Sequence, residues 1–221
     1  AEILGIYGQN GSGKTAIVDA LYFLQKVMVG ADLDQSLEDY MTIDSDAAEI
    51  FADFNIFMDG IVFEIGYTLS LSREEKEIVI NRETLRAAKN ENGIRTNKTT
   101  FMDYQRNQTD AIFKPQKRLD EILEANKEIK TDLIVARKMA EKSNCSYIFG
   151  ESSREIFCRE YKNGFQQFSV IISSLFEFAL KDLFVIRNTH SGVISANFVL
   201  PMAFRIENDN IGAKGDFAVP L

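Results

Sequence analysis

The chain has 221 residues, of which 45% are hydrophobic and 26% charged, as in ordinary globular proteins. Its net charge of −8 argues against a surface that binds DNA over its whole extent. No apolar run approaches the roughly 20 residues of a membrane helix, so we expect a cytoplasmic protein without a membrane partner. The two cysteines lack metal-ligand spacing, and the single histidine, His190, excludes histidine-rich metal sites.

Near the N-terminus, a glycine-rich motif lies between a predicted strand and a predicted helix. The motif reads Gly8-Gln9-Asn10-Gly11-Ser12-Gly13-Lys14-Thr15. An apolar run over residues 3–7 precedes it, and residues 16–29 follow with apolar side chains at helical spacing. A strand, a glycine-rich loop and a helix form the context in which G-x-x-x-x-G-K-[ST] binds phosphate. The sequence therefore predicts that the chain binds a nucleoside triphosphate.

Each residue type in this motif has a physical reason. Glycines let successive backbone N–H groups point at phosphate oxygens, and the helix that follows adds the positive end of its dipole. We expect Lys14 to reach the β- and γ-phosphates as the catalytic lysine, and the Thr15 hydroxyl to ligate Mg²⁺. The cofactors expected are ATP and Mg²⁺, although the motif contacts phosphates and does not distinguish ATP from GTP. The expected nucleotide-binding residues are Gly8, Asn10, Gly11, Ser12, Gly13, Lys14, Thr15 and Ala16.

Residues 48–85 are predicted to form an antiparallel meander. Apolar and polar side chains alternate along them, and Asp59-Gly60 is a tight-turn signal. Strands joined by such short turns must be antiparallel. The predicted strands cover residues 49–57, 61–71 and 77–83. The expected fold class is therefore α/β, a P-loop NTPase core with an antiparallel β-meander and a helical insertion.

The segment 86–118 is the most basic part of the chain. It carries eight basic and three acidic residues, a net charge of +5, and little periodicity. We interpret it as a basic polar insertion that could contact nucleic acid through phosphates. A solvated polar segment without such a partner is the alternative. The candidate contact residues are Arg86, Lys89, Arg95 and Lys98.

Helical periodicity dominates the remainder of the chain. The predicted elements are a helix over residues 116–142, a loop or short strand over 146–163, a buried helix over 165–184, and a strand or short helix over 193–204. The expected organisation is a nucleotide-binding lobe with the meander over residues 1–85, the basic insertion over 86–118, and a helical part that returns toward the core over 119–221.

A catalytic acid is harder to find than the phosphate loop. Hydrolysis requires a hydrophobic strand that ends in an acidic residue, which orients Mg²⁺ and water. The nearest match, Ile61-Val62-Phe63-Glu64, continues directly as a strand, so we interpret Glu64 as part of its polar face. The sequence thus contains a nucleotide cradle without a recognisable catalytic acid, and whether this chain is an ATPase by itself stays open.

The phosphate loop and its flanks resemble the opening of the RecF/SMC-like ABC ATPases, in particular the AAA-type ATP-binding proteins of the abortive-infection and OLD group. Residue 16 is Ala where those families usually have Asn. The resemblance is specific over residues 3–24 and architectural beyond them. The matching residues are Asn10, Ser12, Gly13, Lys14, Thr15, Asp19 and Ala20.

The resemblance implies an ATP-binding head that forms a homodimer through its ATP site and acts in anti-phage defence or DNA maintenance. In those families the Walker B acids and the signature loop lie C-terminal to the insertion. This chain would then be the N-terminal lobe of a longer ATPase, which binds ATP but needs the missing part for efficient turnover. Two alternatives remain: a nucleotide-sensing interaction module without turnover, and the nucleotide-binding subunit of an ABC transporter. The glutamine that senses Mg²⁺ in ABC ATPases is unassigned among Gln25, Gln35, Gln105 and Gln108.

Overall fold

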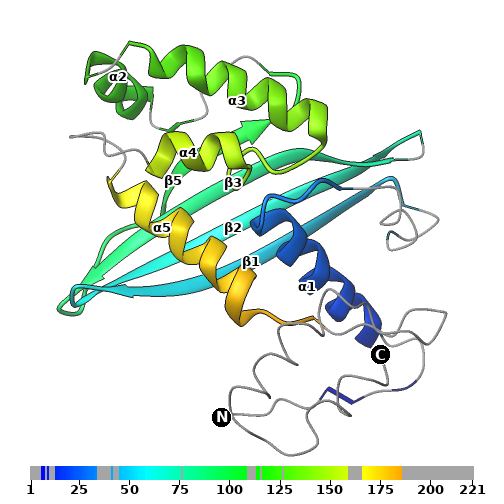
Figure 1. Cartoon of the computed structure of the whole chain (residues 1–221). Coiled ribbons are helices and arrows are strands. Elements are labelled where there is room, and N and C mark those ends of the chain that lie inside the picture. The colour runs from blue at the N-terminus through cyan, green and yellow to red at the C-terminus, as the bar shows by residue number, and fades with distance from the viewer. Residues whose placement is uncertain are drawn as a thin grey trace, which may run out of the picture.

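In the computed structural model, an antiparallel sheet carries helices on one of its faces (Figure 1). The predicted element over residues 193–204 and His190 lie outside the described residues. The structure describes residues 6–7, 9, 13–33, 41, 45–75, 77–108, 113–114, 116–125, 127–158 and 166–185.

The predicted meander is present as the centre of the sheet. Strands β1 (Ala47–Met58) and β2 (Ile61–Glu74) pair antiparallel without interruption, from Ala47 opposite Ser72 to Met58 opposite Ile61. Asp59 and Gly60 join them with φ values of 49° and 78°, the positive pair that a two-residue hairpin requires. Strand β3 (Glu77–Glu91) pairs antiparallel with β2 on its other side. The antiparallel meander is thus confirmed.

The sheet extends into the segment interpreted as a basic insertion. Strand β3 continues beyond residue 85, and both β4 (Ile94–Arg95) and β5 (Thr99–Gln105) pair with it. The sequence pattern did not indicate these strands, because one face of the sheet is polar and the buried side chains on the other face include small alanines. In β3, for example, Arg86 is exposed while its neighbours Leu85 and Ala87 are buried.

The helices correct two predictions. The single helix predicted over residues 116–142 is two helices, α2 (Gln116–Ala125) and α3 (Ile129–Ser143). Their apolar positions are six residues apart between Leu123 and Ile129, which breaks the three- and four-residue spacing of one continuous stripe. The loop or short strand predicted over residues 146–163 contains helix α4 (Glu151–Cys158), whose polar first turn and few apolar residues gave little helical signal.

The helices predicted over residues 16–29 and 165–184 are present at the two ends of the described chain. The first is α1 (Lys14–Met28), and the second is α5 (Gln166–Glu177), which continues as the π-helical segment η2 (Phe178–Asp182). Figure 1 shows α1, α4 and α5 on the same face of the sheet. Each fully buried large apolar side chain in this layer contributes about 1.5–3 kcal/mol. The core side chains of α1 and β2 are Phe23, Leu24, Val27, Met28, Phe63, Ile65, Tyr67, Leu69 and Leu71.

Gly30 lies two residues after the end of helix α1 and terminates it. The N–H of Gly30 donates to the Val27 carbonyl at 3.0 Å, and Gly30 has a φ of 71°, the left-handed conformation common after a helix. A Cβ at this position would lie 2.6 Å from the carbonyl oxygen of Phe149. Both the backbone angle and the close approach therefore require glycine.

Replacing Gly30 by Ala is expected to destabilise the fold by more than the about 1–2 kcal/mol that a left-handed residue costs, because the Phe149 carbonyl must also move. Gly60→Ala is the matched control, since Gly60 has a φ of 78° but open space around a Cβ. Urea unfolding of both variants measures the difference. Equal losses of unfolding free energy would contradict the close packing of α1 against residue 149.

Candidate functional site

The N-terminal end of α1 carries the described part of the glycine-rich motif. Gly13 directly precedes the helix with φ 83° and ψ 9°, and a Cβ there would contact nothing within 4 Å. The Lys14 ammonium folds back and donates a hydrogen bond to the Gln9 carbonyl oxygen at 2.6 Å. The remaining predicted loop residues, Gly8, Asn10, Gly11 and Ser12, lie outside the described residues.

The charge distribution at this helix end fits an anion. Gly13 provides no side-chain cap for the first N–H groups of α1, and the first turn contains no acidic residue. Uncapped N–H groups and the positive end of the helix dipole together favour a bound phosphate. Lys14 is half-buried, whereas Thr15 and Ala16 are exposed on the same turn. The described residues thus place a lysine, a threonine and uncapped helical N–H groups together in the first turn of α1.

The opposite end of α1 is fixed by Gln25. Its side-chain amide donates to the carbonyl oxygens of Ala179, at 3.2 Å, and of Leu183. These carbonyls belong to η2 and the residue after it, where the wider π-helical turn changes the usual helical pairing. Residue 25 lies roughly 16 Å along the helix axis from Lys14. Gln25 therefore anchors this end of α1 and lies far from the phosphate loop.

The structure confirms the interpretation of Glu64 as part of a polar strand face. Its carboxylate accepts two hydrogen bonds from Arg95 Nε at 2.9 Å and one from Arg95 Nη2 at 2.6 Å. The neighbouring side chains in β2, Phe63 and Ile65, are buried on the opposite face against the helices. A carboxylate held by a guanidinium on the polar face is not positioned as the acid of a P-loop site.

Basic residues of the candidate nucleic-acid contact also have carboxylate partners. Lys98 pairs with Asp53 at 2.5 Å, and Lys89 pairs with Glu91 at 2.7 Å. Arg95 pairs with Glu64, as described above, and Arg86 donates to the carbonyl oxygen of Lys98 at 3.4 Å. These pairs weaken the positive field that the local net charge of +5 indicates. Exposed pairs of this kind contribute little to stability, because solvent and salt screen them.

Sequence reasoning missed the most deeply buried charged residue of the sheet, Glu83 in β3. Its carboxylate accepts hydrogen bonds from the Tyr67 hydroxyl at 2.7 Å and the Ser146 hydroxyl at 2.6 Å. It also accepts from the backbone N–H groups of Tyr147, at 2.7 Å, and Ile148, at 3.4 Å. Burial raises the pKa of Glu83, although all four donors favour the charged form.

A signal for this buried position was present in the sequence. Glu83 has the same parity along β3 as Leu85 and Ala87, so it points toward the helices. Three of its four donors come from the connection between α3 and α4, and the same connection contacts the segment after α1, where Asn144 exchanges hydrogen bonds with Leu33. Glu83 therefore ties the sheet to the segment on which the C-terminal end of α1 rests.

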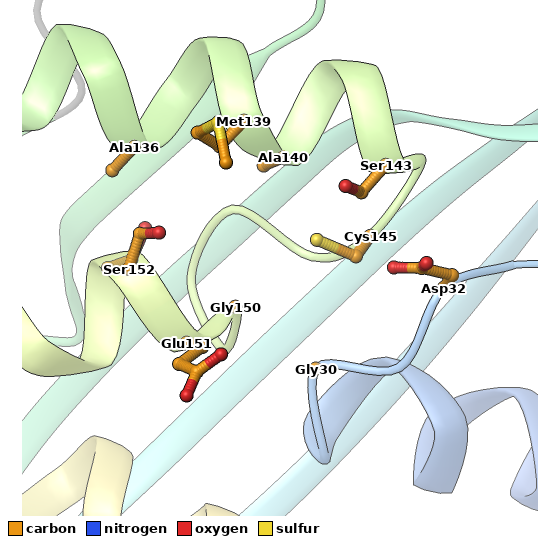
Figure 2. Close-up of a pocket in the computed structure, with 11 residues that line it drawn as sticks. Gly30, Asp32, Ala136, Met139, Ala140, Ser143, Cys145, Gly150, Glu151 and Ser152 are labelled. Carbon is orange, nitrogen blue, oxygen red and sulfur yellow. The ribbon is translucent and has the colours of Figure 1, made fainter.

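A hollow of about 160 Å³ lies beside this connection, between the end of α1, α3 and α4 (Figure 2). Asp32, Glu151 and the Cys145 thiol are among the residues that line it. Burial is the main cause that raises the pKa of Cys145 to about 11, and the nearby carboxylates of Asp32 and Glu83 raise it further. Two carboxylates and a protonated thiol do not fit an anionic nucleotide. This hollow is also at the far end of α1 from Lys14.

Residues 3–132 match the protein family described as "AAA domain, putative AbiEii toxin, Type IV TA system". No curated protein and no solved structure matches the chain. Among the helices that the structure describes, none combines the length and the apolar character of a membrane span. Since the matched residues are more than half of the chain and include α1 and the sheet, the protein belongs to this AAA-domain family of P-loop nucleotide-binding proteins.

Proposed function

We propose that this chain is the MgATP-binding, N-terminal lobe of a RecF/SMC-like ATPase that acts in abortive infection. The observation that carries the proposal is the start of α1. There, left-handed Gly13, Lys14 and uncapped helical N–H groups meet at the end of a complete G-x-x-x-x-G-K-T motif. The family match to an abortive-infection type of AAA domain supports the same conclusion.

In this proposal the Lys14 ammonium exchanges one neutral acceptor for charged ones. In the structure it donates to the Gln9 carbonyl at 2.6 Å. With nucleotide it would turn to the β- and γ-phosphate oxygens, whose charge-assisted hydrogen bonds are about twice as strong as neutral ones. The Thr15 hydroxyl would hold Mg²⁺, which supplies positive charge between the phosphates when bound. Backbone N–H groups over residues 8–16 would complete the cradle.

Hydrolysis would require a carboxylate other than Glu64 and Glu83. Glu64 is engaged by Arg95 on the polar face of the sheet, and Glu83 is fully buried beneath the helices. Two ATP-bound heads would therefore form a homodimer through the nucleotide, each completed by a C-terminal lobe that carries the catalytic acid and signature loop. If no such lobe exists, the same features favour a nucleotide-sensing module without turnover.

The proposal is tested by measuring MgATP binding and phosphate release on the same sample of the full chain. We expect saturable binding without efficient turnover. Absence of MgATP binding would overturn the proposal. Efficient turnover that depends on Lys14 would contradict the half-site and would mean that a catalytic carboxylate lies within the 221 residues.

A further inference from the structure

Strand β1 presents a long edge to its surroundings. It is twelve residues long and pairs with β2 on one side, while no strand within the described part of the chain pairs with its other side. It contains no Lys, Arg or Pro, and its register with β2 shows no bulge. Natural proteins usually protect such edges by charged side chains, especially lysine, or by proline, bulges or covering elements, because free main-chain groups recruit another strand. The only charged side chains of β1 are the acidic Glu49 and Asp53.

The outward side chains of β1 are large and apolar at two positions. Phe51 is 70% exposed and Phe57 is 79% exposed. Both lie on the face of the sheet away from the helices, together with Asp53 and Asn55, because side chains of the same parity share a face. Isolated exposed phenylalanines are common, but two on one strand edge that has no partner strand among the described residues favour a surface that another strand covers.

This strand is self-complementary in one antiparallel register. If a second copy of β1 pairs with a two-fold axis at Phe54, Phe51 of each copy lies across from Phe57 of the other. Asp53 then lies across from Asn55. An axis at Asp53 would instead place two aspartates directly opposite each other, which is unfavourable. Only the axis at Phe54 combines the aromatic pairs with a polar pair that lacks charge repulsion.

An apolar hollow lies beside the part of β1 with which the second copy would pair. It has a volume of about 330 Å³ between α1 and β1. In the register above, Ile56 and Met58 of the second copy would lie across from Ala52 and Ile50. The side chains of Ile56 and Met58 would then lie on the helix-bearing face of the sheet, beside the hollow. Residues of α1 and β1 that line the hollow are Ala16, Ile17, Ala20, Leu21, Leu24, Ile50, Phe51 and Ala52.

We propose that a second copy of this chain pairs antiparallel with β1 along its free edge, with the two-fold axis at Phe54. The two five-stranded sheets then form one continuous sheet, and the partner's β1–β2 turn sits next to α1. This dimer needs no nucleotide and is separate from the dimer proposed through the ATP site. Glu49 and Asp59 come close at the two ends of the paired segment, so added salt strengthens the association by screening them.

Sedimentation velocity and light scattering over a concentration series test the proposal, without nucleotide and with Lys14→Ala in parallel. We expect a concentration-dependent dimer in both proteins. Asn55→Lys places a cation across from Asp53 at two symmetric positions and tightens the dimer, by less than about tenfold because Lys98 already pairs with Asp53, whereas Asn55→Asp weakens it. Because a folding defect cannot tighten the dimer, the lysine variant separates pairing from stability.

Phe57→Lys removes the cross-strand aromatic pairs and is expected to weaken the dimer by about tenfold or more. Its matched control is Ile94→Lys, because Ile94 is 77% exposed but lies in β4, away from the edge of β1. The control leaves the dimer unchanged. A wild-type chain that stays monomeric across the series overturns the proposal. So do equal effects of Asn55→Lys and Asn55→Asp, or of Phe57→Lys and Ile94→Lys.

Discussion

Replacing Lys14 by Ala is expected to lower the affinity for MgATP by about a hundredfold or more. Each charge-assisted hydrogen bond from the ammonium to a phosphate oxygen contributes about 1.5–3 kcal/mol, and the proposal requires at least two of them. Since about 1.4 kcal/mol corresponds to tenfold in affinity, their loss brings binding to the limit of detection. Isothermal titration calorimetry with MgATP measures the change.

Lys26→Ala is the matched control for this experiment. Lys26 lies in the last turn of the same helix, where its ammonium is 5.6 Å from the ring of Tyr22. The Lys26→Ala substitution removes the same charge from α1, but far from the phosphate loop. Wild-type affinity for MgATP is therefore expected. Wild-type affinity in Lys14→Ala, or an equal loss in both variants, would show that Lys14 has no specific role in nucleotide binding.

Replacing Glu83 by Ala is expected to destabilise the fold by about 3–5 kcal/mol, because a buried acceptor with several donors is removed. The hydroxyls of Tyr67 and Ser146 and the N–H of Tyr147 then have no acceptor in the core. The variant also leaves a cavity between the sheet and the α3–α4 connection. Chemical denaturation measured at neutral pH gives the loss of unfolding free energy.

Glu49→Ala controls for removing a glutamate from the same sheet. Glu49 is exposed in β1, and its carboxylate accepts one hydrogen bond from the Ser70 hydroxyl at 3.0 Å. Substitutions at such surface positions usually change stability by less than about 0.5 kcal/mol. Similar unfolding free energies for Glu83→Ala and the wild type would contradict the role of Glu83 as the tie between β3 and the helical layer.

The elements that could be predicted are those in which a local pattern and the tertiary environment agree. Helix α1 and strand β2 each have one apolar face against the core, so their periods of 3.6 and 2 are visible in the sequence. The turn at Asp59 and Gly60 was predictable because both residues adopt positive φ. For the same reason Gly30 could be identified as the end of α1.

The remaining elements depend on contacts that a local pattern does not contain. Strand β5 is held by pairing with β3, and its Asp103 is tied to Arg82 at 2.8 Å and to Lys114 at 2.8 Å. Burial opposes the charge of Asp103, but the hydrogen bonds from these two cations outweigh it and lower its pKa. Ion pairs of this kind allow a polar segment to form a strand even where its sequence shows no alternation of apolar and polar residues.

The candidate site was predictable for a different reason. A phosphate loop acts through main-chain N–H groups, one lysine and one hydroxyl, so its chemistry is contained in eight consecutive residues. The tie at Glu83 has no such local signature, because its donors lie at residues 67 and 146–148. Only the fold brings them to one carboxylate. The same holds for the edge of β1, whose exposure follows from the strand order.

Amide hydrogen exchange with and without MgATP tests the central claim most directly, because it locates the nucleotide on the chain. We predict that exchange slows in peptides that cover residues 8–16, where the N–H groups would bind phosphate oxygens. Peptides from the hollow beside Cys145, at the far end of α1, should be unchanged. Slower exchange at that hollow but not at residues 8–16 would contradict nucleotide binding by the P-loop.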